Sequence, residues 1–431
     1  MKKLILIALA CSLSAAAFAK KSGETRTATV KTEISGSDII NIRAKDTELI
    51  VETWDKNEVE IVATIRFDGE MSNKMENFLA EFEENVKNNI SMTGGELEID
   101  ANLDIPNKIQ IGSKNIGINV SFGDKELKLT YKIKAPKANK YIISSSYQDV
   151  RLVGSFDKLD LTQYSGDLEA GIIKSANMNL KYGTASFESI NEGEMELYEQ
   201  KLEINTLGVL ELNAKYSNLE FEKVDKLEVV AYESDFEIGM ITEMKGNMKY
   251  GEVNIAESIE NAKFEFYEMS IEAAEAGTIE LEDSKYSKFE FGTVSTITFD
   301  QSYEDETDIG TVDSFESKNS KYGNHTIDLL KGNLKLYAYE DEIAIDDLGN
   351  NATELIIDGK YIDASIGIGT ASFNLMTNVK YGKVIYDEST VEVKRYIKDG
   401  DQLEIEAKSK TESTNPILIS VKGYEVDVKL N

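Results

Sequence analysis

The sequence has few of the residues that usually carry enzyme chemistry or covalent cross-links. Its 431 residues include one cysteine, one histidine, one tryptophan and three prolines. Cys11 lies in a predicted signal peptide, so the mature chain has no cysteine for a disulfide, a thiolate metal site or a nucleophile. With so little proline and many aromatic and β-branched residues, the composition favours long strands held by burial and backbone hydrogen bonds.

Residues 1–19 are predicted to be a secretory signal peptide. Two lysines precede a short apolar stretch, and Ala17-Phe18-Ala19 fits cleavage before Lys20. The alternative is a lipoprotein signal ending in Ala8-Leu9-Ala10-Cys11. We do not expect lipid anchoring at Cys11, because the apolar core would be very short. The protein is therefore expected to be exported, to the periplasm or the outer cell surface.

Positive charge is also scarce. Asp and Glu number 78 against 47 Lys and Arg, which gives a net charge of −31, or −33 once Lys2 and Lys3 are removed with the signal peptide. This balance argues against nucleic acid and anionic membranes as partners. Solubility outside the cytoplasm explains the charge, and binding of a cation or a cationic partner is the alternative. No later apolar run is long enough to be a transmembrane segment.

Residues 20–140 are predicted to form a β-rich capping domain with one amphipathic helix near residues 72–88. Antiparallel strands are expected from period-2 alternation at Asp38–Ala44, Thr47–Trp54, Glu58–Arg66, Glu96–Leu103 and Glu126–Lys134. The helix has one apolar stripe that runs from Met71 to Val86, with Ser72 as N-cap and Gly94-Gly95 after its exit. We expect this stripe to pack on a sheet; a partner-binding face is the alternative.

Residues 141–395 carry an internal repeat marked by tyrosine. The intervals between successive tyrosines are 16 to 22 residues, and these tyrosines stand at positions 147, 164, 182, 198, 216, 232, 250, 267, 286, 303, 322, 339, 361 and 381. A fixed period of this kind indicates a solenoid, in which each unit buries its face against its neighbours. The predicted fold class is all-β: a single-stranded β-solenoid (β-helix), closed by capping strands in residues 396–431.

The repeat units are of two alternating kinds. One reads Lys-Tyr-Gly/Ser, as at Lys181-Tyr182-Gly183, with apolar residues 3, 5 and usually 8 positions after the tyrosine. The other usually reads Tyr-Glu, as at Tyr198-Glu199, with apolar residues 4, 6 and often 9 positions after it. A shift of one residue turns a strand's side chains to the opposite face. We therefore predict that one coil contains both kinds, about 34 to 36 residues, so that consecutive tyrosines do not stack.

The repeated tyrosine is predicted to pack at a corner and form ladders that hold the coils together. A surface of exposed aromatic rings that binds a glycan or a protein is the alternative interpretation.

The sequence shows no catalytic constellation, and no catalytic, cofactor-binding or metal-ligating residue is assigned. His325 stands three residues after Tyr322, where other units place Ala, Leu, Val or Phe, so we expect a structural histidine. No serine-hydrolase elbow, phosphate loop or dinucleotide fingerprint is present. Weak calcium binding is left open at two acidic segments, Glu304-Asp305-Glu306-Thr307-Asp308 and Glu340-Asp341-Glu342, although neither matches an EF-hand.

Three features resemble bacterial families of unknown function that are provisionally named adhesins and have β-helical repeats. They are the segment from Leu49 to Val59, the helix followed by Gly94-Gly95 and a strand, and Tyr131 to Pro136 leading into Ile142 to Ser146. The resemblance covers most of the mature chain and implies an exported β-solenoid. Tyrosine stands here where such relatives often have small residues.

Two function classes remain. The first is a non-enzymatic scaffold of the cell envelope that binds an unidentified protein or glycan. The alternative is a β-helical carbohydrate-active enzyme, such as a lyase on a polysaccharide. A lyase acting on an acidic polysaccharide needs a cleft lined with Lys and Arg, and arginine is nearly absent from the repeats. We therefore favour the scaffold and expect no enzyme activity.

Overall fold

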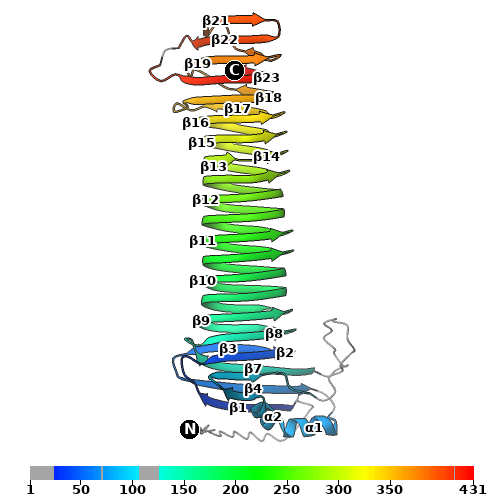
Figure 1. Cartoon of the computed structure of the whole chain (residues 1–431). Helices are drawn as coiled ribbons and strands as arrows, with labels where there is room; N and C mark the ends of the chain where they lie inside the picture. Colours follow the sequence, from blue (N-terminus) through cyan, green and yellow to red (C-terminus); the bar gives the residue numbers. More distant parts are fainter. Residues whose placement is uncertain (1–23, 69–70, 106–125, 412) are drawn as a thin grey trace. The chain divides into compact units, whose positions relative to one another are not determined.

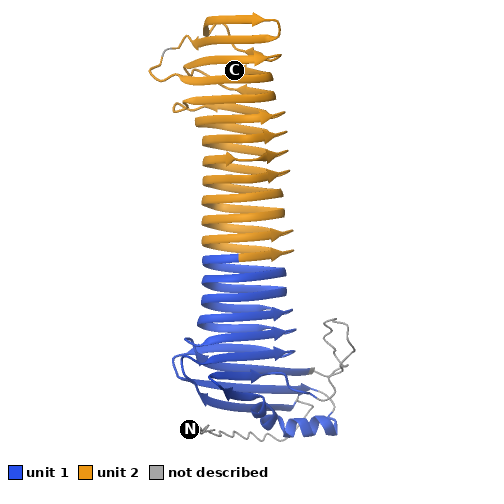
Figure 2. Ribbon diagram, viewed as in Figure 1, with its two compact units in different colours: residues 1–211 blue, residues 212–431 orange. Residues whose placement is uncertain are grey.

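Strands make up most of the structure, a computed structural model that describes residues 24–68, 71–105, 126–411 and 413–431. The predicted all-β fold with little helix is confirmed (Figure 1). The chain divides into two units, residues 1–211 and 212–431 (Figure 2). The predicted signal peptide, including Cys11, lies outside the described residues.

The N-terminal region of the first unit mixes antiparallel and parallel pairs. β1 pairs antiparallel with β4, β4 with β7, and β5 with β6, whereas β2 pairs in parallel with β6 and β8, and β3 with β7 and β9. The expected strands are present, but the prediction of a wholly antiparallel region is wrong. These strands are β1 (Glu24–Glu33), β2 (Ile39–Lys45), β3 (Glu48–Trp54), β4 (Glu58–Asp68), β5 (Ile90–Thr93), β6 (Glu96–Asp100), β7 (Glu126–Pro136), β8 (Lys140–Ser146) and β9 (Val150–Tyr164).

Two short helices stand where one was predicted, α1 (Asn73–Ala80) and α2 (Phe82–Asn88). The Ser72 hydroxyl accepts a hydrogen bond from the Met75 amide at 3.2 Å, which is the expected N-cap. The apolar stripe from Met75 to Val86 is buried, but Met71 precedes the helix and is exposed. Gly94-Gly95 forms the turn between β5 and β6, where both glycines have positive φ.

Parallel pairing between successive windings of the chain forms the rest of the first unit. Residues of β9 pair with residues 17 or 18 positions later in β10 (Leu168–Lys215); Val150 lies beside Leu168, for example. Each strand alternates buried apolar residues with exposed polar ones, so the apolar side chains of every winding point inward.

The second unit repeats this pairing. Asn218 in β11 pairs with Asp235 in β12, 17 residues later, and Lys288 in β13 pairs with Glu306 in β15, 18 residues later. β15 pairs in the same sense with β16, and β16 with β17 and β18. These strands are β11 (Asn218–Tyr232), β12 (Asp235–Lys285), β13 (Lys288–Phe299), β14 (Ser302–Tyr303), β15 (Glu306–Lys321), β16 (Asn324–Tyr339), β17 (Glu342–Leu348) and β18 (Glu354–Ile366).

The size of one winding contradicts the predicted coil of 34 to 36 residues. One winding contains a single tyrosine unit, and consecutive tyrosine rings lie with centroids 5.4 Å apart, as for Tyr286 and Tyr303. The prediction was wrong because it measured register from the tyrosine. The correct reference is the residue with positive φ at the bend of each winding, such as Tyr286 or Glu304.

The C-terminal strands do not simply cover an open end. β23 (Ile417–Leu430) pairs in parallel with β18 on one side and with β19 (Phe373–Lys380) and β20 (Lys383–Ile385) on the other. The last strand of the chain is thus inserted between two earlier ones. β21 (Val391–Asp399) and β22 (Gln402–Ser409) form an antiparallel hairpin, and β22 pairs with β19.

Phenylalanine rings fill part of the interior of the second unit. Phe289 is fully buried and lies 5.3 Å from Phe299 and 6.1 Å from Phe266, measured between ring centroids. Phe289 and Phe299 both belong to β13, whereas the contact between Phe266 and Phe289 joins neighbouring windings, so the core of each winding depends on the next.

We predict that Phe289→Ala lowers the free energy of unfolding by about 3–5 kcal/mol, because it leaves a cavity between windings that cannot collapse. Denaturant titration followed by circular dichroism measures the change. Val230→Ala is the matched control, because Val230 is 57% exposed, and we expect it to stay within about 0.5 kcal/mol of the parent. Equal losses in the two variants would contradict the interior position of Phe289.

Candidate functional site

A continuous ladder of tyrosine rings runs over the windings of the second unit. Neighbouring centroids are 5.2 to 5.8 Å apart and the ring planes meet at 64° to 82°, so the contacts are edge-to-face. In spatial order the rings are Tyr216, Tyr232, Tyr250, Tyr267, Tyr286, Tyr303, Tyr322, Tyr339, Tyr361, Tyr424 and Tyr381. A shorter ladder of the same geometry, Tyr147 to Tyr198, lies in the first unit.

The two kinds of repeat unit differ in which residue makes the bend. In the Lys-Tyr units the tyrosine itself has a left-handed backbone, with φ of 56° at Tyr286. In the Tyr-Glu units the glutamate after the tyrosine has it instead, with φ of 52° at Glu304. Left-handed backbone is uncommon for residues with a bulky side chain, so its recurrence at every winding is a defining feature of this fold.

Aligning the bends removes the apparent conflict of register. Lys285 pairs with Tyr303 across neighbouring windings, which places Tyr286 beside Glu304 at the bend. Counted from the bend, the apolar residues fall at the same positions, 3, 5 and 8, in both kinds of unit. In one kind of unit the tyrosine is the bend residue, and in the other it is the residue before the bend. Neighbouring tyrosines in the ladder therefore come from backbone positions one residue apart, and their rings pack edge-to-face.

The ladder is both a packing device and a surface. Tyr286 and Tyr322 remain 45% and 42% exposed although each contacts two neighbouring rings. The Glu304 carboxylate raises the pKa of the Tyr303 hydroxyl through hydrogen bonding and charge. Such hydroxyls stay protonated at neutral pH and offer neutral polar groups beside aromatic rings.

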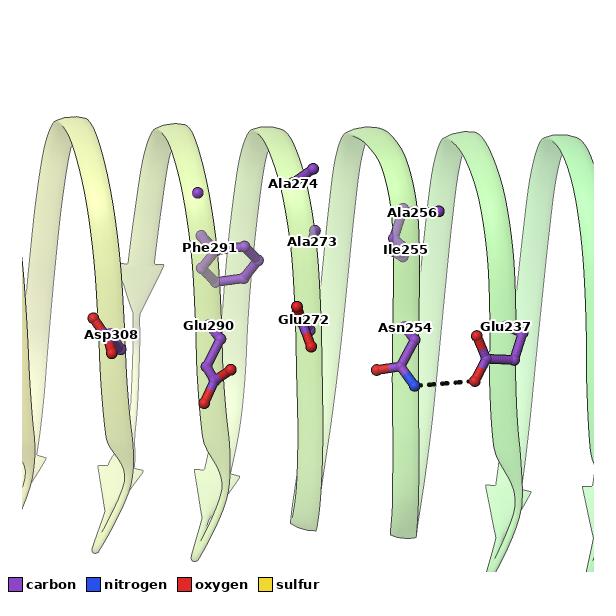
Figure 3. A pocket seen from close by; sticks show the side chains of 11 residues that line it. Glu237, Asn254, Ile255, Ala256, Glu272, Ala273, Ala274, Glu290, Phe291 and Asp308 are labelled. Atoms are coloured by element: carbon purple, nitrogen blue, oxygen red, sulfur yellow. Dashed lines mark hydrogen bonds between the residues drawn. The ribbon is translucent and has the colours of Figure 1, made fainter.

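An acidic groove of about 550 Å³ lies on the outer face of the same unit (Figure 3). One polar side chain from each winding lines it, in a column formed by Glu237, Asn254, Glu272, Glu290 and Asp308. The Asn254 amide donates a hydrogen bond of 3.1 Å to the Glu237 carboxylate. The column repels anions, and the groove lining contains no lysine or arginine.

The two acidic segments considered for calcium do not gather their carboxylates. Along residues 304–308 the side chains alternate, so Asp305 is buried while Glu304, Glu306 and Asp308 are exposed. Asp341 is likewise buried between two exposed glutamates. Within the described residues, no group of three His, Cys, Asp or Glu side chains is placed to hold a metal ion.

His325 lies inside the winding and is fully buried. Its Nδ1 atom is 3.1 Å from the Thr307 hydroxyl, its Nε2 atom is 3.6 Å from Asp341 Oδ2, and its ring contacts Phe299 and Phe315. A Ser-His-Asp hydrolase needs a histidine that a substrate can reach. The position of His325 fits a structural role.

Sequence reasoning missed two groups of residues. Tyr424 belongs to the ladder, and Tyr424-Glu425 with Val428 and Leu430 following at the expected spacing was the signal that could have identified it. The inward-facing polar residues around His325 were also missed. Their signal was a series of polar residues at positions that are apolar in other windings.

Within the described part of the chain, no helix has the length and apolar character needed to cross a membrane. No family model and no curated protein matches the sequence. Among solved structures, a Parabacteroides distasonis protein provisionally named a lipid binding protein is 12% identical, with 71% of this chain and 98% of that chain covered and a TM-score of 0.29. A Clostridium sporogenes protein provisionally named a cell adhesion protein is 9% identical, with coverage of 95% and 100% and a TM-score of 0.17. Likeness at this level carries no argument about function.

Asp305 provides a test of the buried polar interior. Burial raises the pKa of its carboxyl, and hydrogen bonds from the Ser302 hydroxyl (2.7 Å) and the Ser287 amide (2.9 Å) partly oppose the shift. A raised folded-state pKa means that the associated stability is present at low pH and is lost as the pH rises through that value.

We predict that Asp305→Asn becomes more stable relative to the parent as the pH rises from about 3 to about 7, because the amide carries no charge to bury. Denaturant titrations of both proteins across this range measure the difference. The exposed Asp308→Asn serves as control and should show a weaker trend. A stability difference between Asp305→Asn and the parent that does not change with pH would contradict the prediction.

Proposed function

We propose that this protein is a non-enzymatic, exported β-solenoid scaffold of the cell envelope that binds a protein or glycan on its tyrosine ladder. The observation that carries the proposal is the ladder itself, a row of partly exposed aromatic rings repeated at every winding of the second unit. Tyrosine offers an apolar face and a polar tip with little loss of side-chain entropy, which suits it to binding surfaces.

Repetition of the rings supports binding of an extended partner. Edge-to-face contacts between neighbouring rings hold each ring in place before a ligand arrives, which lowers the entropic cost of binding. A long ligand can contact several rings at once, and such multiple contacts raise the overall affinity even where each one is weak.

The negative charge around the ladder limits which partners the surface can bind. Glutamates follow alternate tyrosines along the ladder, and the acidic groove lies on the same unit. An anionic polysaccharide would be repelled by both features. The partner that this surface favours is neutral or cationic, which also argues against the alternative of a lyase on an acidic polysaccharide.

We predict that Tyr286→Asn and Tyr322→Asn each weaken binding about 2- to 10-fold, because each removes one ring from the surface. Asparagine is chosen because it tolerates the left-handed backbone at these two positions. Binding is measured with the mature chain on an array of neutral, acidic and amino-bearing oligosaccharides and on immobilised envelope proteins.

Tyr396→Asn is the matched control, since Tyr396 is 56% exposed on β21 and does not belong to the ladder. Circular dichroism checks that all three variants remain folded. If both ladder variants bind as tightly as the parent, the tyrosine ladder is not the binding surface. If the purified chain cleaves an acidic polysaccharide, and substitution of a few clustered residues abolishes the cleavage, the protein is an enzyme and the scaffold proposal is wrong.

A further inference from the structure

The rings at one end of the tyrosine ladder alternate in exposure. From Tyr286 to Tyr381, a more exposed ring and a half-buried ring follow each other from winding to winding. The more exposed rings, at 40% to 47%, are Tyr286, Tyr322, Tyr361 and Tyr381, and the half-buried rings between them are Tyr303, Tyr339 and Tyr424. The surface that a partner meets therefore repeats every two windings.

The alternation has its cause in the residue that makes the bend. Each more exposed tyrosine is itself the left-handed residue, with φ of 60° at Tyr322. Each half-buried tyrosine stands one residue before the bend, and the glutamate after it has the left-handed backbone instead. The Glu304 and Glu340 carboxylates accept hydrogen bonds from the Tyr303 and Tyr339 hydroxyls and thereby raise the pKa of those hydroxyls. The polar groups of the ladder thus repeat over two windings as well.

The length of this repeat selects among extended polymers. Neighbouring parallel strands lie about 4.8 Å apart, so equivalent rings recur about every 9.6 Å. An extended peptide strand repeats its side chains every two residues, about 6.6 to 6.8 Å, and would fall out of step with the rings. A β-(1→4)-linked glycan turns alternate sugars over, so its faces repeat every two sugars. One sugar of such a chain is close in length to the spacing of one winding.

Charges beside this part of the ladder balance each other. A lysine precedes each more exposed tyrosine, as Lys285 precedes Tyr286, and a glutamate follows each half-buried one, as Glu304 follows Tyr303. Lys285 pairs with Tyr303 across neighbouring windings, so the two kinds of charge alternate along the row. A neutral ligand with many hydroxyl groups complements such a surface, because its hydroxyls can donate to the carboxylates and accept from the ammonium groups.

We propose that the ladder binds a linear, neutral β-(1→4)-linked glycan that runs across the windings with one sugar on each. This inference rests on the function proposed above and specifies its ligand. The apolar faces of alternate sugars stack on Tyr286, Tyr322 and Tyr361, and the hydroxyl groups of the sugars between them meet Glu304 and Glu340. Because the glycan contacts several windings at once, weak contacts at each winding add to a useful affinity.

A proline-rich peptide is the rival ligand with a matching repeat. In the polyproline II conformation such a peptide repeats every three residues, about 9.3 Å. These peptides dock in grooves lined by aromatic side chains. The ladder rings contact one another with centroids 5.4 to 5.8 Å apart, as from Tyr286 to Tyr339, and leave no slot for a proline ring between them. The ring contacts therefore favour the glycan.

The test compares oligosaccharides that differ in linkage. The mature chain is titrated by calorimetry with cellohexaose and N-acetylchitohexaose, which are β-(1→4)-linked, and with maltohexaose, the α-(1→4)-linked isomer of cellohexaose. We expect at least one β-linked hexamer to bind about 10-fold more tightly than maltohexaose, and more tightly than its own tetramer. Tyr322→Asn should weaken that binding about 2- to 10-fold, and Tyr396→Asn, which lies outside the ladder, should leave it unchanged.

The possible failures separate this inference from the scaffold proposal. Equal affinity for the α- and β-linked hexamers, or no binding of either β-linked hexamer, would overturn the inference. The scaffold would still stand if Tyr322→Asn weakened the binding of an envelope protein, a proline-rich peptide or another glycan. Binding that never depends on a ladder tyrosine would reject both. If Tyr322→Asn does not fold, the comparison of linkages on the parent chain still decides the inference.

Discussion

Parallel backbone pairing between successive windings is the interaction on which the rest of this structure depends. Residues 17 or 18 positions apart share hydrogen bonds, so every winding has to bend at the same place as its neighbour. A left-handed residue makes that bend, and in this chain it is a tyrosine or a glutamate far more often than a glycine. Each such residue is disfavoured by its own backbone conformation, and the hydrogen bonds on both sides hold it there.

The tyrosine ladder follows from this constraint. Because the bend residue alternates between tyrosine and the glutamate after a tyrosine, neighbouring rings come from backbone positions one residue apart. The rings pack edge-to-face and stay partly exposed, so the contacts that align the windings also form an aromatic surface. The function that we propose uses this surface, and its partner would meet the same chemistry at every second winding.

The interior of the windings is mostly apolar, with one polar region around His325. Most windings place apolar side chains at the inward positions, and the windings around His325 replace several of them with serine, threonine and aspartate. Such groups are tolerated in an apolar interior only where hydrogen bonds compensate their lost hydration. The hydrogen bonds that Asp305 and Asp341 accept at the corner supply part of this compensation.

Local patterns in the sequence were enough to determine the all-β fold, the tyrosine repeat, the strands of the N-terminal region and the inward position of residues such as Phe289. Alternation within a strand decides which side chains share a face, and that information is local. Tertiary structure alone decided the size of a winding, the insertion of β23 beside β18 and the meeting of Thr307, His325 and Asp341 in the interior. These depend on which strands pair and in what register, and a hydrogen bond between distant residues leaves no mark on the pattern of either strand.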